Sequence, residues 1–172
     1  EAQDLARETL ESAKQVLGLE HPSTLMYSRN LSSILHAEGK HLEVVELLQE
    51  TLDLQRFSLG VDDPDTLSAA STLGLSLYSL GRYDEAADLQ RNTLQAAQQA
   101  ESIDLSSTLV LANNLGMTLL GQGRYDEAAQ LLQNNLLHAR EAFGRENADT
   151  WAAADALGLA LHGQGKYKEA ET

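Results

Sequence analysis

Histidine is the residue type in this chain that could most readily bind a metal ion or transfer a proton near neutral pH. His36 and His41 stand on either side of an expected helix break, and His36 and His162 occupy equivalent places that we expect to be too far apart to share an ion. His21 and His138 have no carboxylate or histidine partner at ligand spacing on one helix face. Cysteine is absent, so thiolate ligands and disulfides are excluded. The sequence therefore predicts no metal site and no cofactor.

Serines, glycines and paired carboxylates could serve nucleophilic, phosphate-binding or acid–base chemistry, but their spacing favours structural roles. No serine lies in a Gly-x-Ser-x-Gly elbow, and the Gly-Lys-Tyr and Gly-Arg-Tyr phrases lack the flanking residues of a phosphate-binding loop. The Asp-Glu pairs at 84–85 and 126–127 fall in the first turn of expected helices, where acids complement the helix dipole. We therefore predict no catalytic residues and a protein that is not an enzyme.

The elements that position these residues come from one unit copied along the chain. Two markers recur in phase and without insertion, the first being the glycine-led phrases that begin at Gly39, Gly81, Gly123 and Gly165. The second marker consists of the pairs Thr24-Leu25, Thr66-Leu67, Thr108-Leu109 and Thr150-Trp151. Both markers keep a step of 42 residues, as from position 39 to position 81. Such a repeat is typical of a solenoid, in which each unit covers its neighbour's apolar face.

Each unit is predicted to form two helices. The first helix runs over about 64–80 in the best-formed unit with Asp63 as its N-cap, and Asp104 is the expected cap where Leu105 replaces a capping residue. First helices end at the recurring glycines, where positive φ closes the helix. Ser102 replaces the glycine that ends other second helices, so we expect a different turn there. The second helices are expected near 41–57, 83–99 and 125–141.

Apolar and small residues repeat with the same step at helical spacing. Leucines recur in first helices at 31, 73, 115 and 157 and in second helices at 5, 47, 89 and 131. Glycine recurs at the helix-interior positions Gly74, Gly116 and Gly158, which indicates a close approach of two helices. We therefore expect leucine at position 116 to overpack that crossing.

The whole chain, 1–172, is expected to be a single repeat array. Its predicted parts are a second helix of a preceding repeat at 1–18, repeats at 22–60, 64–102 and 106–144, and, at 148–172, the first helix of a truncated final repeat with the start of its second helix. The pairs Glu1-Ala2 and Glu169-Ala170 align with Glu85-Ala86 inside a second helix. We therefore expect a fragment of a longer array, whose uncapped ends could support self-association.

The segments Leu73-Gly74, Gly81-Arg82-Tyr83 and Glu85-Ala86 resemble the tetratricopeptide repeat. The longer unit, the linker phrase Asp63-Pro64-Asp65-Thr66-Leu67 and the phrase Asn113-Asn114-Leu115-Gly116 are similar to repeats of kinesin light chain and of sensor arrays attached to signalling ATPases. The resemblance implies an all-α, right-handed superhelical solenoid of antiparallel helix pairs. It also implies that first helices line the concave surface and second helices the convex one.

The resemblance places a peptide-binding groove along the first helices. Asn30 and Asn114 hold the position at which kinesin light chains use asparagine to hold a peptide backbone, although Thr72 and Ala156 interrupt the series. Apolar members of the row could form pockets or could pack beneath the next repeat. Arg29 is the row's only cation, which argues against a clamp for carboxylate-ended chaperone tails. The expected groove residues are Arg29, Asn30, Ser33, Ser71, Thr72, Leu75, Tyr78, Asn113, Asn114, Met117, Asp155 and Leu159.

The formal net charge of −14 disfavours nucleic acids and anionic membranes as partners. No stretch approaches the roughly 18 apolar residues of a membrane span, and no signal peptide is evident, so we predict a cytoplasmic protein. The predicted function is a protein–protein interaction scaffold that binds a peptide segment of a partner. The alternatives are a regulatory sensor region of a signalling ATPase and a self-assembling structural array.

Overall fold

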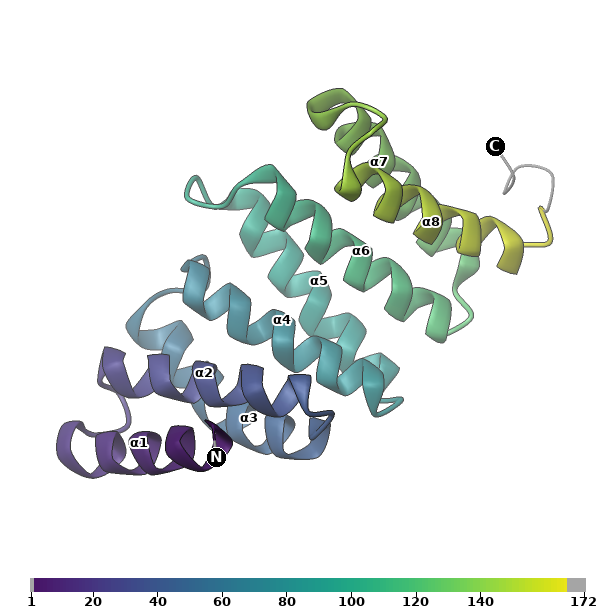
Figure 1. Ribbon diagram of the computed structural model, residues 1–172. Coiled ribbons are helices and arrows are strands. Elements are labelled where there is room, and N and C mark those ends of the chain that lie inside the picture. Colours follow the sequence, from purple (N-terminus) through teal and green to yellow (C-terminus); the bar gives the residue numbers. More distant parts are fainter. Residues whose placement is uncertain (1, 167–172) are drawn as a thin grey trace. The chain divides into compact units, whose positions relative to one another are not determined.

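The structure is a computed structural model that describes residues 2–166, and these residues form α-helices and turns without a β-strand (Figure 1). The eight helices within this range are α1 (Ala2–Leu17), α2 (Pro22–Ala37), α3 (His41–Ser58), α4 (Pro64–Ser79), α5 (Tyr83–Gln99), α6 (Leu105–Gly121), α7 (Tyr125–Phe143) and α8 (Ala148–Gly163). Each lies within a few residues of a predicted helix. Glu1, the pair Glu169-Ala170 and the expected start of a last second helix lie outside the described residues.

The helices fall into two compact units, Glu1–Arg82 and Tyr83–Thr172, called here the N-terminal unit (α1–α4) and the C-terminal unit (α5–α8). The boundary lies in the turn between α4 and α5, inside the predicted repeat 64–102. The predicted repeat boundaries themselves stay a prediction. Within each unit, every helix packs against the next one along the chain.

Both units place first and second helices in two separate layers. The backbones of the first helices α2 and α4 come within 8 Å of each other, and so do those of α6 and α8. Within the described residues, the second helices α1 and α3 have no such backbone approach, and neither have α5 and α7. Each unit therefore has one side on which first helices lie close together and another on which second helices stand apart.

The first helices begin at the side-chain caps expected from the sequence. Asp63 accepts hydrogen bonds from the backbone N–H groups of Asp65 and Thr66, at 2.9 and 3.3 Å. Asp104 accepts one from the backbone N–H of Ser107 at 2.7 Å, which confirms the cap that was predicted one residue before Leu105. These bonds satisfy N–H groups that have no partner inside the helix.

Glycines in the left-handed region end the first helices, as predicted. Gly81 has φ of 73°, which allows the N–H of Arg82 to bond back to the carbonyl of Leu77 at 2.9 Å. The same bond follows Gly39, Gly123 and Gly165. No non-glycine residue among those described has positive φ, so Ser102 ends α5 through another kind of turn.

Leucines and alanines form most of the apolar core of each unit. Three pairs four residues apart on first helices are buried: Leu31 and Leu35, Leu73 and Leu77, and Leu115 and Leu119. The series at 47, 89 and 131 on second helices is only half-buried, and Leu5 is exposed. Trp151 is 61% exposed, whereas its equivalents Leu25, Leu67 and Leu109 are buried.

Gly116 marks the close approach of α6 and α7. A Cβ atom at this glycine would lie 2.6 Å from Cδ2 of Leu132, whose side chain is fully buried. Gly121 has a related role at the end of α6, because a Cβ there would lie 2.8 Å from the ring of Tyr83. These glycines therefore give side chains of the neighbouring second helices room to pack.

Candidate functional site

The expected groove residues lie on the first helices of each unit, and in either unit we call them its first-helix surface. In the N-terminal unit they lie on α2 and α4. None of the seven is fully buried: Asn30 and Ser33 are exposed, and Arg29, Ser71, Thr72, Leu75 and Tyr78 are half-buried. They are therefore accessible in part or in full.

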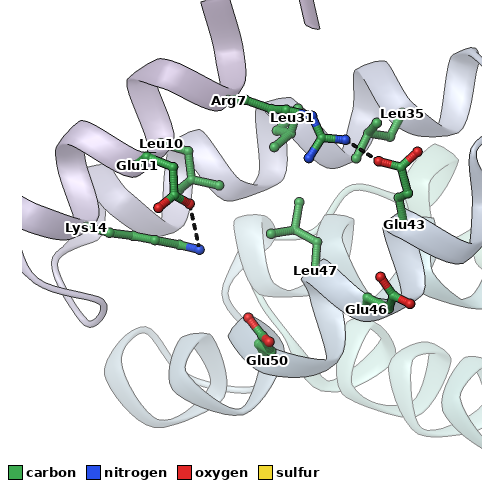
Figure 2. Close-up of a pocket in the computed structure, with 10 residues that line it drawn as sticks. All are labelled: Arg7, Leu10, Glu11, Lys14, Leu31, Leu35, Glu43, Glu46, Leu47 and Glu50. Carbon is green, nitrogen blue, oxygen red and sulfur yellow. Dashed lines mark hydrogen bonds and ion pairs between the residues drawn. The ribbon is translucent and has the colours of Figure 1, made fainter. Parts of the chain in front are cut away.

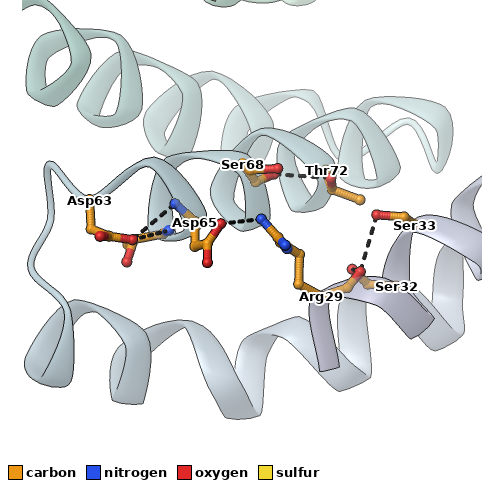
Figure 3. Close-up of polar contacts among 8 residues, drawn as sticks. Arg29, Ser32, Ser33, Asp63, Asp65, Ser68 and Thr72 are labelled. Carbon is orange, nitrogen blue, oxygen red and sulfur yellow. Dashed lines mark hydrogen bonds and ion pairs between the residues drawn. The ribbon is translucent and has the colours of Figure 1, made fainter. Parts of the chain in front are cut away.

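Arg29 and Asp65 join the two first helices of this unit (Figure 3). The guanidinium of Arg29 on α2 forms an ion pair with the carboxylate of Asp65 in the first turn of α4. The Asp63 cap holds the backbone N–H of Asp65 at 2.9 Å, so Asp65 is held by both its backbone and its side chain. The one cation of the expected groove is thus neutralised within the protein.

Hydroxyl groups on this surface hydrogen-bond to their own helices. Ser33 Oγ donates to the Arg29 carbonyl at 3.1 Å, and Thr72 Oγ1 donates to the Ser68 carbonyl at 3.0 Å (Figure 3). Each hydroxyl proton is therefore already donated within the helix, but the hydroxyl oxygens can still accept a hydrogen bond from a ligand. Asn30 differs from them, because its side chain makes no hydrogen bond to any described residue.

The C-terminal unit carries five expected site residues. Asn113, Asn114 and Met117 on α6 are half-buried, and Asp155 and Leu159 on α8 are exposed. The two neighbouring asparagines differ in their hydrogen bonds. Asn113 Oδ1 accepts a bond at 3.1 Å from Nδ2 of Asn135, a buried residue of α7. The Asn114 side chain has no such bond within the described part of the chain.

Asn135 is a polar core residue that is not among the site residues predicted from the sequence. Its Nδ2 group donates to both Asn113 Oδ1 and the Leu109 carbonyl, each at 3.1 Å, and so links α7 to α6. The equivalent positions hold Thr9, Thr51 and Thr93. This break in an otherwise constant series was the signal that could have identified it. The Oδ1 atom of Asn113 therefore has a structural role, because it accepts the hydrogen bond from Asn135.

The helix break between α2 and α3 brings His36 and His41 into contact. The rings of His36 and His41 lie 5.1 Å apart at 64° to each other, and His36 Nδ1 is 2.9 Å from Ser76 Oγ. Burial lowers the pKa of His36 below its ordinary value, and the neighbouring His41 lowers it further. Among residues 2–166, no cluster of three or more His, Asp or Glu residues has the geometry of a metal site.

Within the same range, no helix combines the length and the apolar character needed to cross a bilayer.

Family models match most of the chain. A tetratricopeptide repeat model matches residues 26–99 and 107–172, and a second tetratricopeptide repeat model matches residues 1–23. A search of curated proteins returns no match.

Solved structures with the same fold include repeat arrays of kinesin light chain type. A candidate kinesin light chain of Podosopora anserina with nearly identical TPR-like repeats matches with a TM-score of 0.87 and 24% identity, over 99% of this chain and 81% of that one. A point variant of that same protein gives 0.89 and 24%, over 99% and 80%. BtubC (BKLC) from P. vanneervenii gives 0.75 and 19%, over 98% and 68%. The predicted all-α fold is confirmed by these matches.

Proposed function

Because this chain belongs to the tetratricopeptide repeat family, we propose that the first-helix surface of each unit binds an extended peptide segment of a partner protein. Tetratricopeptide repeats are in general protein–protein interaction scaffolds, and the fold is in general non-catalytic. The proposal adds to this general function a ligand class and a set of contacting residues.

The main support for this proposal is that Asn30 and Asn114 are equivalent residues whose side-chain amides are both available to a ligand. They hold the same repeat position in the two units, and neither side chain makes a hydrogen bond to a described residue. An amide side chain can donate to a peptide carbonyl and accept from a peptide N–H at once. Each unit therefore offers one such group for a peptide backbone.

The surrounding residues favour a ligand of mixed polar and apolar character. Met117 lies one turn after Asn114 on α6, and Leu75 lies on α4, the first helix next to that of Asn30. Both are half-buried, so they could contact apolar side chains of the peptide. Arg29 is already paired with Asp65 and has no second cation beside it in the expected row. A ligand that depends on a terminal carboxylate is therefore disfavoured.

The test uses peptides that are first selected from a peptide array for binding to the wild-type protein. Their binding to alanine variants is then measured. Asn30→Ala and Asn114→Ala, alone and combined, should weaken binding in titration calorimetry while unfolding free energy stays within about 1 kcal/mol, because alanine is a good helix former. Asn92→Ala changes an exposed asparagine of the second helix α5 and serves as the matched control. Equal affinity of the double variant and the control would show that these two asparagines of the first-helix surface do not bind the peptide.

Self-association is the second candidate function, and the exposed Trp151 favours it. An indole that is 61% exposed on α8 is a large apolar surface. Light scattering at several concentrations separates the two functions, since a peptide-binding monomer keeps its mass. A mass that grows with concentration and reverts in Trp151→Ser would favour assembly.

Two further parts of the proposal concern the whole protein. A cytoplasmic location is tested by fluorescence microscopy of the tagged full-length protein. A role as the sensor region of a signalling ATPase requires a nucleotide-binding segment in that full-length chain.

A further inference from the structure

A second surface lies between the second helices of the N-terminal unit, in the layer away from the first-helix surface. A groove of about 280 Å³ separates α1 from α3, and its apolar lining comes from Leu10, Leu31, Leu35 and Leu47 (Figure 2). The groove exists because the backbones of α1 and α3 do not approach within 8 Å. Side chains of α2 therefore form part of its floor.

The C-terminal unit contains the same groove. There it lies between α5 and α7, has a volume of about 410 Å³ and is lined by Leu94, Leu115, Leu119 and Leu131. Each of these leucines is 84 residues after its counterpart in the first groove, as from Leu10 to Leu94, and the remaining lining positions correspond in the same way. The two units thus form the same kind of groove from equivalent residues.

The rims of the two grooves differ in charge. In the N-terminal unit the rim carries two cations, Arg7 and Lys14, against four carboxylates, which are Glu11, Glu43, Glu46 and Glu50. In the C-terminal unit one cation, Arg91, faces one carboxylate, Glu127, and amides occupy the other positions at 95, 98, 130 and 134. Only the first groove therefore has a negative rim.

Two of the four carboxylates remain without a counter-charge. Arg7 pairs with Glu43 across the groove, and Lys14 pairs with Glu11 at 3.3 Å along α1 (Figure 2). Glu46 and Glu50 are exposed and form no ion pair or hydrogen bond with a described residue. They stand one turn apart on the same face of α3, where two like charges disfavour the helix. A cation between them would remove this repulsion.

We propose that the groove between α1 and α3 binds a basic amphipathic helix of a partner protein. An apolar residue of that helix contacts the half-buried Leu47 in the groove, and lysine or arginine residues one turn apart meet Glu46 and Glu50. A second copy of this chain is a poor occupant, because its formal net charge of −14 repels the same rim. Nucleic acid is excluded by the sign of its charge.

A synthetic leucine–lysine peptide with leucines at i, i+3, i+4 and i+7 is the probe. In fluorescence anisotropy it should bind the wild-type protein, and Glu46→Gln combined with Glu50→Gln should weaken binding about tenfold, the effect of two lost ion pairs. The matched control is Glu141→Gln combined with Glu146→Gln, which changes the net charge equally at exposed residues outside the groove. The control should keep wild-type affinity.

Any of three results would overturn the proposal: no binding to the wild-type protein, no loss in the groove variant, or an equal loss in the control. A gain-of-function variant tests the role of the rim directly. Gln130→Glu combined with Asn134→Glu gives the second groove the two carboxylates of the first. The number of peptides bound per protein chain should then rise from one to two. A value that stays at one would contradict the proposal that the rim carboxylates bind the peptide.

Discussion

Arg29 on α2 and Asp65 on α4 form an ion pair that joins the first helices of two successive helix pairs. Both side chains are part-exposed, at 27% and 45%. Exposed ion pairs of this kind contribute little to folding, because water already solvates both charges. The pair therefore bears more on the charge of the first-helix surface than on stability.

Arg29→Ala should lower the free energy of unfolding by no more than about 1 kcal/mol. Asp65→Asn should have an equally small effect on stability, but it leaves Arg29 uncompensated. The affinity for acidic peptides should then increase relative to wild type, and calorimetry at low salt measures it. A loss of more than about 2 kcal/mol in urea unfolding of Arg29→Ala would show that the pair is a structural element instead.

Gly116 and Leu132 are expected to be coupled. Gly116→Leu should destabilise the protein by about 1–3 kcal/mol, because even a Cβ at this position would lie 2.6 Å from the Leu132 side chain. Gly116→Ala should not produce the gain of about 1 kcal/mol that alanine brings to an open helix position. In a Leu132→Ala background, the same Gly116→Ala change should become favourable. Additive effects of the two changes in urea unfolding would refute the coupling.

Asn135 should be costly to truncate. Asn135→Ala removes the donor shared by Asn113 Oδ1 and the Leu109 carbonyl, and we expect a loss of about 1–3 kcal/mol in unfolding free energy. Asn92→Ala, on an exposed face of α5, is the control and should be close to neutral. Equal stability of the two variants would mean that the link between α6 and α7 adds nothing.

His36 should make stability depend on pH. Its folded-state pKa lies below the ordinary 6.5 because of burial and the nearby His41. As pH falls below 6.5, the unfolded chain therefore binds more protons than the folded chain. The free energy of unfolding accordingly decreases on acidification from 6.5 down to the lowered pKa of His36. Urea unfolding at pH 7.5 and at pH 5.5 measures the difference.

His36→Gln should flatten that dependence, whereas His138→Gln, at an exposed site on α7, should leave it unchanged. Identical pH profiles for wild type and His36→Gln would show that another group is responsible.

The sequence predicted helices and caps well, because these depend on residues close together in the chain. Asp63, Asp104 and the glycines at 39 and 81 act on backbone groups within a few residues, so their types alone identify the ends of helices.

The polar links between helices were not predictable in the same way. Arg29 and Asp65 are 36 residues apart, and the pairing of Asn113 with Asn135 spans 22. Such contacts depend on the rotation of one helix against another and on side-chain rotamers, which the periodicity does not encode. The groove between α1 and α3 was missed for a related reason. Leu47 follows the core leucine pattern, yet the separation of the second helices leaves it half-buried.

Chemical-shift mapping shows which helices contact a bound peptide. In spectra of the ¹⁵N-labelled protein titrated with an array-selected, uncharged extended peptide, the side-chain NH₂ signals of Asn30 and Asn114 should shift in a saturable way. Signals from exposed residues of α1, α3, α5 and α7, including the side chain of Asn92, should stay in place. Saturable shifts confined to those second helices, with Asn30 and Asn114 unmoved, would contradict a first-helix binding surface.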